Sequence, residues 1–212
     1  SPPPTTSPTA LADPYSLMYT MYSAFDSLGI IRKDSAMAAG FLNQPMHTNN
    51  CTNVLAGTLT LNDTSFSVLG STYYMPRKQC ITGNLKWSCT GSGTITPFTH
   101  TYIASYPIYS QPNLLPDTIS KSIGATLNIS GISNISQDVL ASLYEGANSV
   151  HFISFSQNTV LTVTPSNLNS FSANTYAYFQ MDMGKNKTEN LGGVLHGFAQ
   201  FYRYTKLIYI KP

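Results

Sequence analysis

Apolar and polar side chains alternate along most of this chain, and turn-forming residues interrupt the alternation at intervals of roughly eight to twelve residues. Successive side chains of a strand point to opposite faces, so a period of two predicts antiparallel strands with one buried and one solvated face. Residues 119–129 show the pattern most fully, with Ile123, Ala125, Leu127 and Ile129 sharing one parity and Ser, Gly, Thr or Asn between them. We predict a strand here whose apolar parity faces one core, within an all-β, antiparallel β-sandwich fold.

The same alternation predicts the other strands. Residues 55–68 are expected to form a hairpin that turns at 62–64, and residues 139–145 favour a strand over a helix because apolar residues alternate there. Further strands are expected at 17–25, 35–42, 72–75, 85–89, 98–104, 150–155, 160–164, 175–183 and 194–210. We expect the last of these to be two strands, with Gly192, Gly193 and Gly197 marking a bulge or tight bend. Residues 165–168 are expected to form one helical turn.

Proline-rich segments divide the chain. Four prolines among the first eight residues predict that residues 1–14 are a disordered Pro/Thr-rich tether. Three prolines within 106–117 interrupt any strand ladder and indicate a boundary. The prediction is two immunoglobulin-like sandwiches, residues 15–112 and 113–212, each with about seven strands. One continuous larger sandwich is the alternative, since the apolar residues and tyrosines of 106–117 can join the two halves into one core.

Charge excludes some partners. Charged residues make up 9% of the 212 residues, against about 25% in a typical soluble protein, and the formal net charge is +2. Such sparse charge predicts no nucleic-acid binding and no polybasic membrane patch. No run of 18 apolar residues occurs, so none of the sequence is a candidate membrane-spanning helix.

Three Ser/Thr-rich segments, residues 87–98, 115–121 and 163–168, resemble secreted and lipid-anchored β-sandwich proteins of Bacteroidota that have no assigned activity. The proline-rich start resembles the spacer that follows a lipidated cysteine in such proteins. The resemblance implies an extracytoplasmic protein, either secreted or held at the outer membrane or cell surface by a lipid anchor outside this chain. We therefore expect the precursor to carry an export signal. The resemblance implies no catalytic residues.

The cysteines and histidines offer few ligands. Cys80 and Cys89 flank a turn at 82–84, so a hairpin can bring them within disulfide reach. We favour the alternative, in which Cys89 is a small buried apolar side chain on the parity of Leu85 and Trp87. His47 and Cys51 are the only pair near zinc-ligand spacing, and no second pair follows them. We predict neither a metal site nor a cofactor, and expect the remaining histidines, His100, His151 and His196, to be hydrogen-bonded strand residues.

No catalytic arrangement stands out. Ser92 lies between two glycines but lacks the flanking sequence of a nucleophile elbow, and the two glutamates, Glu145 and Glu189, are far apart in the chain. We therefore predict no enzymatic activity and name no catalytic residue.

Tyrosines are numerous, and they suit either a binding face for carbohydrate or protein or ordinary cross-strand pairing on a solvated face. The ten considered are Tyr73, Tyr74, Tyr102, Tyr106, Tyr109, Tyr176, Tyr178, Tyr202, Tyr204 and Tyr209. Trp87, the single tryptophan, shares parity with Leu85 and Cys89, and we predict that it is buried rather than a ligand platform.

The function predicted is a non-catalytic binding or surface-structural module whose partner is a carbohydrate or another surface protein. Two alternatives remain. A cleft with two facing acids would favour a hydrolase of cell-surface glycans. A final strand such as 207–210 at an open sheet edge would favour a surface-fibre subunit.

Overall fold

The computed structural model describes residues 14–46, 50–75, 83–136, 139–154 and 159–212, so the predicted tether lies, apart from Pro14, outside the described residues. The described residues form strands and two single-turn 3-10 helices, η1 (Pro112–Leu114) and η2 (Pro165–Leu168), with no α-helix among them. The predicted all-β class and the helical turn at 165–168 are therefore confirmed. Within this part of the chain, no helix has the length and apolar character needed to cross a membrane.

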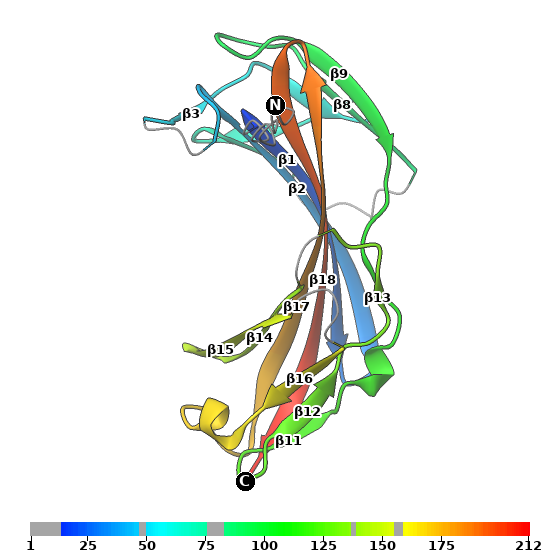
Figure 1. Cartoon of the computed structure of the whole chain (residues 1–212), viewed down its shortest axis with the longest axis vertical. Helices are drawn as coiled ribbons and strands as arrows, with labels where there is room; N and C mark the ends of the chain where they lie inside the picture. The colour runs from blue at the N-terminus through cyan, green and yellow to red at the C-terminus, as the bar shows by residue number, and fades with distance from the viewer. Residues whose placement is uncertain (1–13, 47–49, 76–82, 137–138, 155–158) are drawn as a thin grey trace, which may run out of the picture.

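Two long hairpins form the middle of a ten-stranded sheet, which we call the central sheet. The hairpins are β1 (Ser16–Ser27) with β2 (Ile30–Leu42), and β17 (Thr175–Leu191) with β18 (Val194–Lys211). Parallel pairing of β1 with β18, from Ser16 opposite His196 to Asp26 opposite Lys206, joins them. Figure 1 shows these strands running from one end of the molecule to the other.

Shorter strands extend the central sheet on both sides. Its order is β15-β14-β17-β18-β1-β2-β7-β6, with β11 also paired to β18 and β3 to β2. The added strands are β3 (Asn53–Val54), β6 (Ser67–Leu69), β7 (Thr72–Met75), β11 (Thr118–Ser120), β14 (Val139–Glu145) and β15 (Asn148–Ser154). The strand predicted at 139–145 is therefore confirmed.

Three small sheets complete the fold. They are β5-β4-β8-β9, β10-β13 and β12-β16. Their strands are β4 (Leu59–Leu61), β5 (Thr64–Ser65), β8 (Asn84–Cys89), β9 (Phe98–Ile103), β10 (Ile108–Tyr109), β12 (Ala125–Asn128), β13 (Ile132–Ser133) and β16 (Val160–Val163). The predicted hairpin appears as β4–β5, where Asn62 and Asp63 both have positive φ, as the favoured two-residue hairpin turn requires.

Two apolar cores fill the space between the central sheet and the small sheets. One contains Phe41, Trp87 and Phe198, and the other contains Leu127, Phe179 and Tyr204. Even-numbered residues of β18, such as Phe198 and Tyr204, point into these cores, and we call that side of the central sheet the inner face. The opposite side is the outer face. The two cores lie at opposite ends of the long strands, because one includes Met18 of β1 and the other includes Ala24 of β1. We call the stretch between them, at Thr20 of β1 and Gln200 of β18, the waist.

The long strands link the two halves of the sequence. β1 belongs to the predicted first domain and pairs with β18 of the second, and Phe198 packs in the same core as Trp87. This pairing favours the single continuous sandwich that we considered as the alternative. The assignment of residues 15–112 and 113–212 to separate domains stays a prediction.

The predicted strand over 119–129 is wrong in its middle. The backbone turns after β11, with a Gly124 N to Ser120 O hydrogen bond of 2.7 Å, and resumes as β12. Gly124 has φ +81°, and a Cβ there would lie 2.1 Å from the Val163 carbonyl oxygen. The turn leaves Ile123 79% exposed instead of facing the core, and Ala125 only half-buried, whereas Leu127 and Ile129 are buried as predicted.

The expectation of two strands within 194–210 is also wrong, because β18 is continuous from Val194 to Lys211. Gly192 and Gly193 have positive φ and form the turn of the β17–β18 hairpin rather than a bulge. Gly197 lies inside β18 where β1 approaches closely, since a Cβ at Gly197 would lie 3.1 Å from the Ser16 carbonyl oxygen.

Candidate functional site

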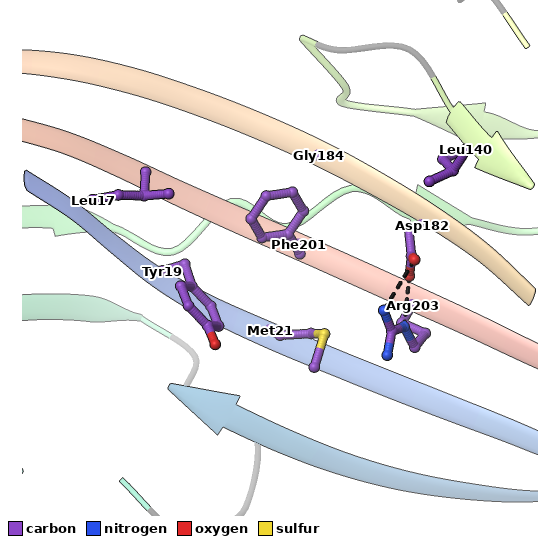
Figure 2. Close-up of a pocket in the computed structure, with 8 residues that line it drawn as sticks. All are labelled: Leu17, Tyr19, Met21, Leu140, Asp182, Gly184, Phe201 and Arg203. Carbon is purple, nitrogen blue, oxygen red and sulfur yellow. Dashed lines mark hydrogen bonds and ion pairs between the residues drawn. The ribbon is translucent and has the colours of Figure 1, made fainter. Parts of the chain in front are cut away.

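A groove of about 620 Å³ lies on the outer face of the central sheet at the waist, and we call it the outer groove. Four strands supply its lining, which Figure 2 shows: Leu17, Tyr19, Met21, Leu140, Asp182, Gly184, Phe201 and Arg203. Within the described residues, none of the three small sheets packs over the outer face, because their buried side chains belong to the cores on the inner face.

Strand alternation explains why these side chains gather. Odd-numbered residues of β1 and β18 share the outer face, and Met21 is the register partner of Phe201. Gly184 is the partner of Phe201 on the other side, so the β17 position next to the phenyl ring carries no side chain. Tyr19 meets Phe201 edge to face, with ring centroids 6.3 Å apart. The result is an open apolar floor flanked by two aromatic rings.

An ion pair closes one end of the outer groove. Arg203 Nε lies 2.6 Å from Asp182 Oδ1 and Nη2 lies 3.0 Å from Oδ2, which is the two-pronged geometry that fixes both side chains. Gln180 Nε2 also donates to Asp182 Oδ2, at 2.9 Å. Asp182 raises the pKa of the Arg203 guanidinium. The remaining guanidinium N–H groups have no partner among the described residues, so Arg203 can still donate to a ligand.

Tyrosines continue the outer face beyond the ion pair. Tyr144 and Tyr178 are register partners on β14 and β17, and their rings stack with centroids 5.3 Å apart. Phe25 of β1 approaches Tyr178 at 6.0 Å. The Tyr144–Tyr178 contact is a cross-strand pair of the kind that we offered as the ordinary explanation of the tyrosines.

The ten tyrosines considered from sequence separate by burial. Tyr73, Tyr109, Tyr202 and Tyr204 belong to the cores, whereas Tyr74, Tyr176 and Tyr178 are exposed. Burial raises the pKa of Tyr202 to about 12, so its phenol stays neutral in the core. Trp87 is fully buried, as predicted, and its Nε1 donates to the Tyr102 hydroxyl at 3.3 Å.

The predicted cysteine and metal sites are only partly within the described residues. Cys80 and His47 lie outside them, and the Cys80–Cys89 disulfide stays the less favoured of our two interpretations of Cys89. Cys89 has a buried free thiol that lies 3.1 Å from the Ala56 carbonyl oxygen, and Cys51 Sγ lies 3.6 Å from the Gln44 carbonyl oxygen. In the described part of the chain, no three His, Cys, Asp or Glu side chains are grouped to hold a metal.

The remaining histidines lie in strands. His196 Nδ1 lies 2.7 Å from Ser16 Oγ and His151 Nδ1 lies 2.8 Å from Ser142 Oγ, as expected of hydrogen-bonded strand residues. His100 instead packs its ring on Phe198, with centroids 4.7 Å apart, and its Nε2 has no hydrogen-bond partner. Burial lowers the pKa of His196 to about 4, so this ring is neutral at physiological pH. The Ser16–His196 pair is fully buried and offers no approach to a substrate.

Two carboxylates line another cavity, of about 380 Å³, beside the end of β1. Asp26 accepts hydrogen bonds from the Gly29 backbone and the Tyr204 hydroxyl. Asp117 pairs with the buried ammonium of Lys206 at 2.8 Å. The Lys206 ammonium also donates to the Leu115 carbonyl oxygen at 2.7 Å, which ties residues 115–117 to β18.

Sequence reasoning did not single out the residues of the outer groove. The available signal was that residues 17–25 are apolar on both parities, with Leu17, Tyr19 and Met21 on one and Met18 and Ala24 on the other. A strand of this kind needs cover on both faces, or exposes an apolar surface on one.

No family model matches the sequence, and no curated protein matches it. Among solved structures, the chain is similar to one described as "Structural insight into host cell surface retention of a 1.5-MDa bacterial ice-binding adhesin", with a TM-score of 0.24 and 11% identity. The match covers 92% of this chain and spans 65% of the length of that chain. A TM-score of this size carries no argument about fold or function.

Proposed function

We propose that this protein is an extracytoplasmic, non-catalytic binding module that docks a partner protein in the outer groove. One observation carries the proposal: an uncovered sheet face presents Tyr19, Met21 and Phe201 beside an ordered Arg203–Asp182 pair. A fold that leaves such a surface open gains from a partner that removes it from water.

The side chains favour a protein over a sugar. Tyrosine, phenylalanine, methionine and arginine are the residues enriched at the centre of protein interfaces. Leu17, Met21 and Leu140 add aliphatic surface, which offers a sugar hydroxyl no hydrogen bond. The Arg203–Asp182 pair then supplies directional polar contacts at the edge of an apolar centre.

Sparse charge and the proline-rich start support an extracytoplasmic location. The codons upstream of Ser1 test this part of the proposal. An apolar export segment in the precursor supports it, and an initiator methionine directly before Ser1 contradicts it.

A photocrosslinking amino acid at Leu140 tests the docking site, because this groove residue is 45% exposed, so its replacement should leave the fold intact. The matched control places the same amino acid at Ile123, which is 79% exposed and lies outside the groove. On cells that express the whole gene, we expect a discrete protein adduct from position 140 and none from position 123. Phe201→Asp should abolish the adduct.

A different surface protein in that adduct supports the proposal, whereas a second copy of this chain would assign the groove to self-association instead. Equal crosslinking from both positions, or none from position 140, contradicts it. Binding to an immobilised glycan panel that Phe201→Asp removes would assign the groove to a carbohydrate instead.

A hydrolase of cell-surface glycans is the second candidate, because Asp26 and Asp117 line one cavity. Asp117→Asn should then abolish release of reducing sugar from a polysaccharide panel, and an inactive wild-type protein would exclude the substrates tested. The observation that would favour a fibre subunit is missing, since residues 207–210 of β18 pair with β17 on one side and Tyr209 and Ile210 pair with β11 on the other.

A further inference from the structure

A second cavity, of about 290 Å³, lies at the waist on the inner face, and we call it the inner pocket. Its lining comes from the end of β9, from Ser105, and from β17 and β18, and it includes Tyr102, Lys185, Phe198 and Gln200. Lys185 and Gln200 are register partners, so their side chains leave the sheet next to each other on one face. The outer groove lies across the same strands, because the neighbouring residues Gly184 and Phe201 point the other way.

Lys185 is a half-buried cation that the described residues do not neutralise. Its ammonium lies 2.7 Å from Asn134 Oδ1 and 3.1 Å from Ser105 Oγ, and none of the ion pairs in the described residues includes it. An ammonium has three donors, so one N–H and the full charge remain available. A partly desolvated cation without an anion is unfavourable unless a ligand supplies one.

The acceptors that hold Lys185 are themselves fixed. Asn134 Nδ2 lies within 2.9 Å of the Ser105 carbonyl, the Ser105 hydroxyl and the Tyr106 carbonyl oxygens. These contacts direct Asn134 Oδ1 toward Lys185. The ammonium is therefore held in place before any ligand arrives, which lowers the entropic cost of binding.

Gln200 provides a second donor without an acceptor. Its side chain is 5% exposed, and its Oε1 accepts from the Ser105 backbone N–H at 3.0 Å. Its Nε2 is buried with no hydrogen-bond partner. Leaving a buried amide N–H unpaired costs about 1 to 3 kcal/mol, so a ligand that brings an acceptor gains from it.

Two aromatic rings form part of the wall of the inner pocket. Tyr102 meets Phe198 edge to face at 5.5 Å, and burial raises the pKa of Tyr102 to about 12, so its phenol does not repel an anion at neutral pH. Lys187 at this pocket already pairs with Glu189. One uncompensated positive charge beside two rings therefore matches a monoanion with a ring-shaped body.

We propose that the inner pocket binds a small organic carboxylate, whose carboxylate oxygens meet Lys185 and Gln200 and whose ring lies against Phe198 and Tyr102. This class includes both aromatic acids and acidic sugars. The site stands independently of the outer groove, because its side chains are on the other face of the sheet.

The test is a titration of the whole chain with sodium benzoate and sodium glucuronate, followed by amide NMR. We expect saturable shifts of the Gln200 side-chain amide with at least one of the two acids. Benzyl alcohol and glucose, the neutral counterparts, should produce none at the same concentrations. Response to benzoate alone assigns an aromatic acid and response to glucuronate alone assigns an acidic sugar.

Variants separate binding from folding. Lys185→Gln should weaken binding at least tenfold, and Lys185→Arg, which keeps the charge, should stay within about threefold of wild type. Lys86→Gln is the control, because Lys86 is an exposed lysine that does not line the inner pocket, and it should change affinity less than twofold. If Lys185→Gln does not fold, the loss of binding between 20 and 300 mM NaCl in wild type gives the same information.

The absence of a saturable shift with both acids would overturn the proposal. Equal response to an acid and its neutral counterpart, unchanged affinity in Lys185→Gln, or salt-independent binding would overturn it as well.

Discussion

Replacement of Trp87 by alanine tests how much the apolar core that contains Phe41 and Phe198 stabilises this fold. The indole is fully buried, stacks on Phe66 at 5.4 Å and meets Phe198 edge to face at 6.4 Å. A tryptophan buries about 150 to 250 Å² of surface, which at about 25 cal/mol per Å² corresponds to roughly 4 to 6 kcal/mol. Partial collapse of the cavity reduces this figure, and the lost hydrogen bond to Tyr102 adds about 0.5 to 1 kcal/mol.

We therefore expect Trp87→Ala to lower the free energy of unfolding by about 4 kcal/mol. With an m-value of about 2 to 3 kcal/mol/M, the urea midpoint should fall by roughly 1.5 M. Circular dichroism follows the transition, since the variant has no tryptophan to report it. Wild-type emission should be blue-shifted and resistant to acrylamide.

Lys86→Ala is the matched control, because Lys86 neighbours Trp87 on the exposed face of β8 and forms only a surface ion pair with Asp63. It should change stability by less than about 1 kcal/mol. A loss below 1 kcal/mol in Trp87→Ala with an unchanged m-value, or a red-shifted and readily quenched wild-type emission, would refute the reasoning.

Three further predictions concern stability. The pKa of His196 is about 4 in the folded state and about 6.5 in the unfolded state, so the unfolded state binds more protons between these values. The contribution of His196 to stability is therefore greatest above pH 6.5 and falls by about 3 kcal/mol as the pH drops to 4. Urea titrations should show a shallower pH dependence of stability in His196→Phe than in wild type, and equal slopes would contradict this. Ile123→Ser should leave the free energy of unfolding nearly unchanged, whereas Leu127→Ala should lower it by about 2 to 5 kcal/mol, since only Leu127 is buried. Thermal and urea unfolding measure both changes, and similar losses would support the continuous strand predicted from sequence over 119–129. Gly124→Ala should destabilise by more than about 2 kcal/mol, because of its positive φ and the Val163 carbonyl, whereas Gly146→Ala, with positive φ but open space, should cost less.

The sequence by itself determined local structure. Alternation and turn residues were enough to predict the all-β class, the β4–β5 hairpin, the β14 strand and the burial of Trp87, because each depends on side-chain parity over a few neighbouring residues. The same reasoning failed at Ile123, where the left-handed conformation of Gly124 depends on the Val163 backbone from β16, 39 residues away in the chain.

Only the tertiary structure decided which faces meet. The parallel pairing of β1 with β18 brings Tyr19 and Met21 beside Phe201. The antiparallel pairing of β17 with β18 brings Asp182 to Arg203 and Lys185 to Gln200. Period two tells which residues share a face of one strand, but not which strand lies beside it. Both candidate sites are built from such long-range neighbours. The apolar residues on both parities of β1 were the one local sign that its outer face has a role, and the partner strands that complete the groove follow from packing of the whole chain.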